Sequence, residues 1–193
     1  MKRVAYILPG YRESHLKQGG YTKMAKFFEA QGITPVHVEI DWRRQKPERL
    51  SDYTEQFLRV YKREKDTAVY ILGFSYGAMI AFLTAAQTKP DVLVLCSLSP
   101  YFEEDLKNLK PAWLRSWKKD FIESDYSFAK LASRIKSKTY LIVGEKEHAS
   151  CLIRARDAKK KLSDSHLRVV RGAKHKIGQK QYLAAIEKVV HLS

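Results

Sequence analysis

The chain has 193 residues, 45% of them hydrophobic and 30% charged, a composition typical of one folded globular domain and unlike that of a disordered or fibrous chain. Its formal net charge is +15, but the basic surplus is concentrated in residues 151–193, where eleven Lys and Arg stand against three Asp and Glu. Such a surplus can mark a nucleic-acid partner. Because no aromatic-interleaved or helix-turn-helix pattern accompanies it, we interpret the segment as a solvated surface and expect no nucleic-acid binding.

The first apolar run of the chain ends at Pro9-Gly10 after five residues, which is too short for a signal peptide or a membrane span and predicts a strand. Similar runs bounded by turn residues predict six strands in all, at residues 4–8, 36–40, 68–72, 92–98, 140–143 and 167–170. Segments with helical spacing follow these runs. This alternation predicts an α/β fold, in which a mainly parallel six-stranded sheet is covered by helices on both faces as a three-layer sandwich.

Three segments carry apolar residues at the spacing of an amphipathic helix. The stripes consist of Tyr21, Met24, Ala25 and Phe28; of Leu50, Tyr53, Phe57 and Tyr61, just after Pro47; and of Ile177, Leu183, Ile186 and Val190. Residues 77–86 are apolar on nearly every side. This last pattern predicts a helix buried beneath the centre of the sheet rather than one lying on its surface.

One connection is much longer than a single crossover helix requires, since nearly forty residues separate Pro100 from Lys138. Within it, Trp113 and Trp117 are four residues apart and follow Pro111, so a helix would place both indoles on one face. Insertions of this length between core elements commonly form lids. We therefore predict a short helical lid at about residues 101–137.

The pentapeptide Gly73-Phe74-Ser75-Tyr76-Gly77 stands between a predicted strand and the predicted buried helix. A serine held in a sharp, strained turn needs neighbours without a Cβ, so that backbone can approach closely on both sides. The positive end of the helix dipole would then lie beneath its hydroxyl. The pattern predicts a nucleophile at Ser75, with a helix N-cap as the alternative role for the same residue.

With this motif, the chain resembles the α/β-hydrolase superfamily over almost its whole length. That family orders its catalytic residues as serine, acid and histidine, with the acid after a late strand and the histidine after the last. Glu147 stands three residues past Gly144, where the family usually has aspartate, and Gly172-Ala173-Lys174-His175 resembles the approach to the catalytic histidine. The resemblance implies a small single-domain serine hydrolase over residues 1–193, with Ser75 as nucleophile, Glu147 as acid and His175 as base.

Two nearby residues compete for these roles. Glu145 is the alternative carboxylate in the same turn, and His148, beside Glu147, is a weaker alternative to His175. The choice of His175 rests on its place in the family order, and histidine suits a general base because its ordinary pKa of about 6.5 leaves it largely neutral near pH 7.

The segment Leu8-Pro9-Gly10-Tyr11 lies where the family builds half of its oxyanion hole. The resemblance implies that the backbone N–H groups of Tyr11 and Tyr76 stabilise the developing negative charge. The sequence departs from the family here, because the histidine or further glycine that often follows is missing. Residues expected around the substrate pocket are Gly10, Tyr101, Trp113 and Trp117.

The resemblance implies a small carboxylic ester or thioester as the substrate, cleaved through an acyl-serine intermediate. Two other functions stay open: an inactive binding protein with the same fold, and an acyltransferase or thioesterase acting on an anionic or carrier-bound acyl group, which the basic surplus would attract. No nucleotide, metal or cofactor motif occurs in the sequence, so we expect neither a cofactor nor a metal. Cys96 and Cys151 show no disulfide framework and no metal-ligand spacing, which favours a reducing cytoplasm.

Overall fold

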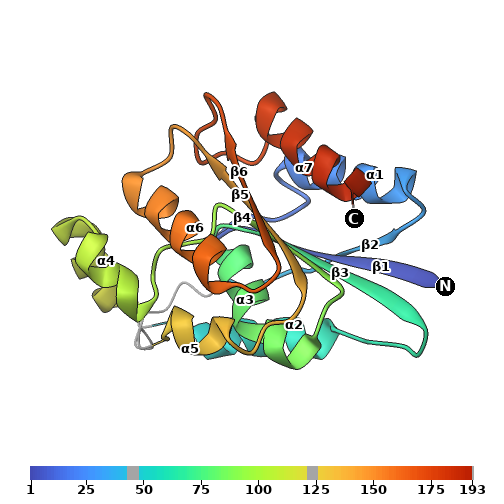
Figure 1. Cartoon of the computed structure of the whole chain (residues 1–193), viewed down its shortest axis with the longest axis horizontal. Helices are drawn as coiled ribbons and strands as arrows, with labels where there is room; N and C mark the ends of the chain where they lie inside the picture. Colours follow the sequence, from blue (N-terminus) through green and yellow to red (C-terminus); the bar gives the residue numbers. More distant parts are fainter. Residues whose placement is uncertain (43–47, 121–125, 193) are drawn as a thin grey trace.

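The computed structural model of the protein describes residues 1–42, 48–120 and 126–192 (Figure 1). In these residues six strands form one sheet in the order β2-β1-β3-β4-β5-β6, and each neighbouring pair is parallel. The strands are β1 (Lys2–Leu8), β2 (Thr34–His37), β3 (Thr67–Phe74), β4 (Val92–Cys96), β5 (Lys138–Gly144) and β6 (Ser165–Val170). The predicted fold class, a six-stranded parallel sheet between helices, is confirmed.

Helices cover both faces of this sheet (Figure 1). One face carries α1 (Gly19–Ala30) and α7 (Lys180–Leu192), and the other carries α2 (Leu50–Val60), α3 (Tyr76–Thr88) and α6 (Ala149–Lys161). None of the helices in the described part of the chain combines the length and apolarity needed to cross a bilayer.

The strands at the centre of the sheet contribute side chains to two separate hydrophobic cores. Along β3, Val69 and Ile71 point into the core beneath α2 and α3, whereas Tyr70 and Leu72 point into the core beneath α1 and α7. Successive side chains of a strand face opposite sides, so every residue of β3 is buried. The expectation that all strands are covered on both faces is wrong at β6, where His166 and Val169 are exposed because this strand forms the edge of the sheet.

The predicted helices are found, although Tyr61 follows the last residue of α2 and Ile177 precedes α7. Four strands contain their predicted ranges, whereas the predicted ranges of β2 and β4 extend past the ends of the observed strands. The apolar stripe of α1 is buried, as are Leu50, Tyr53 and Phe57 of α2; Pro47 lies outside the described residues. Strand β2 was predicted to start two residues later and to end three residues later than it does, because Val38 and Ile40 stay buried after the chain leaves the sheet. Strand β4 ends at Cys96 instead of residue 98, because Ser97 adopts a φ of 50°, outside the extended region.

The long connection between β4 and β5 contains a 3₁₀ helix, η1 (Glu103–Asn108), and two helices, α4 (Pro111–Asp120) and α5 (Phe128–Ala132). Arg154 of α6 anchors η1, because its fully buried guanidinium donates a hydrogen bond to Asp105 Oδ1 at 3.0 Å and lies 4.0 Å from the ring centroid of Phe128. Among the described side chains of α4, by contrast, only Trp117 is buried. The base of the insertion is thus fixed to the body of the protein, while α4 lies on the surface.

The strand order reverses direction beside β1. The chain runs outward from β1 to β2 and then returns to place β3 on the other side of β1. The loops that follow β1 and β3 therefore leave the carboxyl end of the sheet toward opposite faces. Open α/β sheets bind their ligands in the crevice that forms at such a point.

Candidate active site

Ser75 occupies the turn between β3 and α3 in a strained conformation, with φ 56° and ψ −116°. Two glycines make this turn possible. A Cβ on Gly73 would lie 2.3 Å from the carbonyl oxygen of Gly77, and a Cβ on Gly77 would lie 2.4 Å from the carbonyl oxygens of Leu8 and Pro9. The alternative role of a side-chain N-cap is wrong, because Ser75 stands at the N-cap position of α3 but its side chain makes no capping hydrogen bond.

The hydroxyl of Ser75 instead faces His175, with 3.0 Å between Ser75 Oγ and His175 Nε2. The other ring nitrogen, Nδ1, lies 2.7 Å from Oε2 of Glu147. A carboxylate only accepts hydrogen bonds, so Nδ1 carries the proton and Nε2 is left to accept the proton of Ser75. The structure thus joins the three residues of the predicted triad in one hydrogen-bonded chain.

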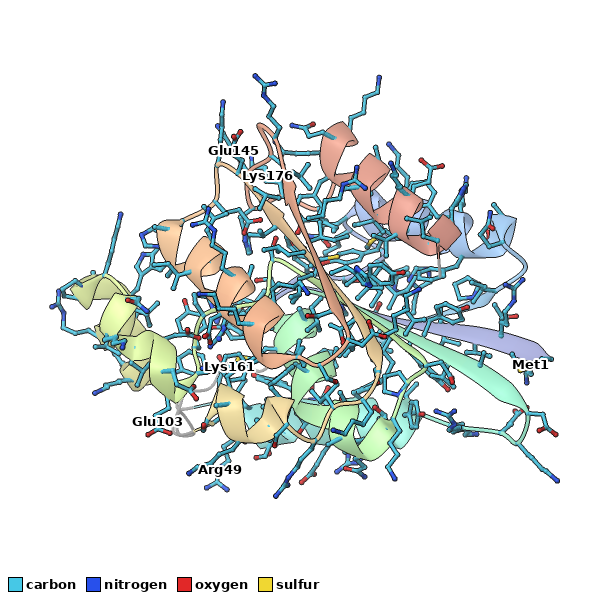
Figure 2. The ribbon with its side chains drawn as sticks, viewed as in Figure 1. Met1, Arg49, Glu103, Glu145, Lys161 and Lys176 are labelled. Carbon is cyan, nitrogen blue, oxygen red and sulfur yellow. The ribbon has the colours of Figure 1, made fainter. Side chains whose placement is uncertain are left out.

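Two loops meet at the end of the sheet to bring Glu147 and His175 together. Glu147 lies in the turn between β5 and α6, and His175 lies in the loop between β6 and α7. Lys146 N donates to Ala173 O at 2.8 Å, and in Figure 2 the labelled residues Glu145 and Lys176 of these two loops lie close together. Gly144 permits this contact, because a Cβ there would lie 2.5 Å from the same carbonyl oxygen.

The carboxylate of Glu147 has a second, buried set of partners. Its Oε1 accepts hydrogen bonds from Gly144 N and from Ser97 Oγ, both at 2.6 Å. Ser97 Oγ also lies 2.6 Å from the hydroxyl of Tyr182 on α7. Neither Ser97 nor Tyr182 was predicted to belong to the site, and no signal in the sequence pointed to Ser97, because the predicted strand 92–98 included it.

The competing residues have other contacts. Glu145 Oε2 accepts a hydrogen bond from Gly172 N at 2.8 Å, in the loop that leads to His175. His148 Nδ1 caps α6 by accepting from Ser150 N at 3.2 Å, and its ring lies 4.4 Å from that of Trp113. Neither side chain forms a hydrogen bond with His175 or Ser75.

Tyr11 and Tyr76, whose backbone N–H groups were predicted to form the oxyanion hole, lie next to each other with ring centroids 5.0 Å apart. The close approach of Gly77 to Leu8 and Pro9 packs the loop after β1 against the first turn of α3. Burial, assisted by the hydrogen bond to Glu48, raises the pKa of the Tyr11 hydroxyl to about 12. Burial also raises the pKa of Tyr76 well above its ordinary value, so both phenols are neutral near pH 7.

A cavity of about 300 Å³ opens beside the serine. It is lined by Ser75, Tyr76, Ser99, Pro100, Tyr101, Trp113, His148, Cys151 and His175. Of the residues predicted to surround the substrate, Tyr101 and Trp113 therefore line it, whereas Gly10 and Trp117 do not.

The two predicted residues that do not line the cavity have other contacts. Gly10 N donates to the hydroxyl of Tyr21 at 2.8 Å, on the side of the sheet covered by α1. The indole of Trp117 is 2% exposed and stacks on Tyr101 with ring centroids 4.3 Å apart. Helical spacing places Trp113 and Trp117 on one face of α4, but only the former reaches the cavity, and the latter supports its aromatic wall.

Two polar residues of the cavity were not predicted. Ser99 Oγ lies 3.4 Å from Ser75 Oγ. Cys151, in the first turn of α6, is buried, and this burial together with the nearby Glu147 carboxylate raises the pKa of its thiol to about 12. A thiol with so high a pKa is protonated near pH 7 and does not compete with Ser75 as a nucleophile. Cys151, Glu147 and His175 are nevertheless the types of residue that hold metal ions.

A scan of the sequence against protein-family models finds no match, and a comparison with curated proteins finds none either. Solved structures do match the fold. An esterase, Est1E from Butyrivibrio proteoclasticus with ferulic acid bound, is similar with a TM-score of 0.75 and 13% identity over 97% of this chain and 86% of that chain. An α/β-hydrolase enzyme from the metagenome of lagoon sediments at Mar Chica, Morocco, has a TM-score of 0.73 and 17% identity over 100% and 90% of the two chains.

A thioesterase domain from the curacin biosynthetic pathway is also similar, with a TM-score of 0.71 and 15% identity over 98% of this chain and 91% of that chain. The protein therefore has the α/β-hydrolase fold, and the resemblance stated from the sequence is confirmed at the level of the fold. Because one fold can support many reactions, the reaction has to be argued from the site.

Proposed function

We propose that the protein is a serine hydrolase that cleaves a small carboxylic ester or thioester through an acyl-serine intermediate. The observation that carries this proposal is the chain of hydrogen bonds from Ser75 Oγ through His175 to Glu147, with distances of 3.0 and 2.7 Å. Because this series of hydrogen bonds is unbroken, it argues against the alternative of an inactive binding protein.

In this mechanism His175 Nε2 takes the proton of Ser75 as Oγ attacks the acyl carbon. The backbone N–H groups of Tyr11 and Tyr76 stabilise the resulting oxyanion, and Glu147 holds the tautomer of the imidazole and stabilises its cation. His175 then gives its proton to the leaving alcohol or thiol. A water molecule, activated by the same histidine, cleaves the acyl-serine ester and restores the enzyme.

The cavity supports a small acyl group with apolar or aromatic character. Its volume is about 300 Å³, and Tyr76, Tyr101 and Trp113 supply aromatic walls. The solved esterase with ferulic acid bound shows that a structure of this fold takes an aromatic acid. We therefore expect short aliphatic and aromatic acyl esters to be accepted ahead of long-chain lipids.

A thioester on an anionic carrier is the second candidate substrate. The net charge of +15 would attract such a carrier electrostatically, and one structure with a similar fold is a thioesterase domain. A thioester would react at the same serine, because the mechanism differs only in the leaving group. We place the reaction in a reducing cytoplasm, with no nucleic acid involved.

Labelling with a fluorophosphonate probe tests the proposal, because this reagent phosphonylates an activated serine. We expect the wild-type protein to be labelled and both Ser75→Ala and His175→Ala to lose the labelling. Ser99→Ala is the matched control, since it removes the hydroxyl only 3.4 Å from Ser75 Oγ and should leave Ser75 reactive. Undiminished labelling of Ser75→Ala would overturn the proposed nucleophile. If the labelling is lost as expected, hydrolysis rates with the p-nitrophenyl esters of acetate and ferulate rank the two acyl groups.

A further inference from the structure

Cys151 lines the cavity but has no part in the proposed hydrolysis. It stands in the first turn of α6, four residues after Glu147, and its side chain reaches the same cavity as His175. It is 6% exposed, so it is almost shielded from solvent except through that cavity. A thiol beside a buried carboxylate and an imidazole can act with them as a metal ligand.

The donor atoms of Glu147, Cys151 and His175 lie within 4.8 Å of one another. A carboxylate oxygen, a thiolate and an imidazole nitrogen are ligands of Zn²⁺, and sites with three protein ligands leave the fourth position open to water. Bonds of about 2.0–2.3 Å in a tetrahedral site would place neighbouring donors about 3.3–3.5 Å apart. Cys151 Sγ would have to move toward the other two donors by about 1 Å. His175 Nδ1 and Glu147 Oε2, now 2.7 Å apart, would have to separate slightly. A rotation of roughly 35° about the Cα–Cβ bond of Cys151 moves its sulfur by a distance of this size.

The carboxylate is already oriented as a metal ligand would be. Gly144 N and Ser97 Oγ hold Oε1 of Glu147 at 2.6 Å each, which leaves Oε2 to face His175. Outer contacts of this kind fix ligands in metal sites. Charge also favours a divalent cation. A buried thiolate next to a buried carboxylate would be unfavourable without a counter-charge, and the two positive charges of the ion neutralise these two negative charges.

We infer that Glu147, Cys151 and His175 form a binding site for a thiophilic divalent cation, with Zn²⁺ as the model ion, and that occupancy switches the enzyme off. Cys151 releases its thiol proton to solvent as the ion binds, and the proton on Nδ1 of His175 moves to Nε2. The ion then takes the place of the hydrogen bond between His175 Nδ1 and Glu147 Oε2. The imidazole then no longer takes the proton of Ser75. The inhibition rests on the proposed function, whereas the binding does not.

Metal binding is tested without reference to activity by titrating the protein with Co²⁺ and then with Zn²⁺. Thiolate ligation of Co²⁺ gives a charge-transfer band in the near ultraviolet, and Zn²⁺ should displace the cobalt. We expect the band in the wild type and in Cys96→Ala, the matched control that removes the other buried thiol. Cys151→Ala and the closer isostere Cys151→Ser should lose the band and bind Zn²⁺ at least about tenfold more weakly. A band or a zinc affinity that survives in both Cys151 variants overturns the site.

Inhibition is tested by fluorophosphonate labelling with and without Zn²⁺, each variant being compared with its own metal-free rate. Zn²⁺ should block labelling of the wild type and of Cys96→Ala, a chelator should restore it, and both Cys151 variants should be far less affected. Mg²⁺ should have no effect, because it prefers oxygen ligands. Zinc binding that depends on Cys151 but leaves the labelling unchanged would overturn the inhibition. Absence of labelling in the metal-free wild type would instead count against the proposed hydrolase function, and the result on zinc binding would still stand.

Discussion

The hydroxyl of Ser97 donates a hydrogen bond to Oε1 of Glu147 at 2.6 Å, which joins the end of β4 to the turn after β5. Ser97 is fully buried and has a φ of 50°, a conformation that is uncommon for a residue with a Cβ. Since Oε1 is occupied by this contact and by Gly144 N, Oε2 is the oxygen that faces His175. The strained serine thus acts as a positioning residue for the proposed acid.

We predict that Ser97→Ala lowers kcat by about 10–100-fold, because a buried hydrogen bond to a charged group contributes about 1.5–3 kcal/mol. KM should change little, since Ser97 does not line the cavity. Steady-state kinetics with a p-nitrophenyl ester provides both constants. Tyr182→Phe, which removes the hydroxyl 2.6 Å from Ser97 Oγ without touching Glu147, should have a smaller effect. A rise in KM at unchanged kcat would contradict the positioning role.

A second prediction separates the two glutamates of the β5–α6 turn. Glu147→Gln should lower kcat by about four orders of magnitude, because an amide does not stabilise the histidine cation and can hold the wrong tautomer. Glu145→Gln should retain activity within a few fold, since the side chain of Glu145 accepts its hydrogen bond from the backbone of Gly172 and not from His175. Equal losses in the two variants would contradict the assignment of Glu147 as the acid.

The fold, and the meeting of Ser75, Glu147 and His175 in one hydrogen-bonded chain, could be predicted from the sequence because their signals are local. Strands and helices show periods of 2 and 3.6 residues, and Ser75, Glu147 and His175 each follow a predicted strand within five residues, in the order of a known family. The error at β2 has the same origin. Apolar residues continue through Val38 and Ile40, which are buried without belonging to the strand, and the pattern does not distinguish burial from strand pairing.

The remaining site residues could not be predicted, because their roles depend on neighbours that are distant along the chain. Ser97 reaches Glu147 only because β4 and β5 are adjacent in the sheet. Cys151 shares a cavity with His175 only because two loops meet at one end of that sheet. Helical spacing likewise placed Trp113 and Trp117 on one face but carried no information about which other side chain would cover either indole.

A third prediction concerns the ion pair between Arg154 and Asp105, which fixes η1 to α6. Arg154 is fully buried and Asp105 is 3% exposed. Removing one partner of a buried pair leaves the other charge uncompensated, so Arg154→Met should lower the free energy of unfolding by about 3–5 kcal/mol. The double variant with Asp105→Asn should recover part of this loss in urea titrations. Arg156→Met is the matched control, because Arg156 is exposed on the same helix and should cost less than about 0.5 kcal/mol.

A fourth prediction concerns pH and the carboxylate of Glu104. Burial alone would raise its pKa, but hydrogen bonds from Ala129 N, Phe128 N and Ser127 Oγ outweigh burial and lower the pKa from 4.5 to about 2. The folded state therefore binds the proton less readily than the unfolded state. The stability that this carboxylate contributes is complete above about pH 4.5 and is lost as the pH falls toward about 2.

Thermal unfolding of the wild type and of Glu104→Gln, measured from neutral pH down to about pH 3, checks this sign. The difference in Tm should be largest near neutral pH and should shrink as the solution becomes acidic, because protonated Glu104 resembles the amide. Glu103→Gln, which alters the exposed neighbour, should show a small difference at every pH. A gap between wild type and Glu104→Gln that widens on acidification would show that the pKa of this carboxyl is not lowered in the folded state.

The last prediction assigns different roles to the two tryptophans of α4. Trp113 is 39% exposed and lines the cavity, so Trp113→Ala should raise KM for an aromatic ester by about tenfold, equivalent to about 1.4 kcal/mol. KM for the acetyl ester and the Tm should hardly change, because a small acyl group does not need that wall and little buried surface is lost. Trp117→Ala should instead lower the free energy of unfolding by about 3–5 kcal/mol, since it removes a buried indole stacked on Tyr101. Equal effects of Trp113→Ala on both esters would mean that the acyl group does not bind against this wall.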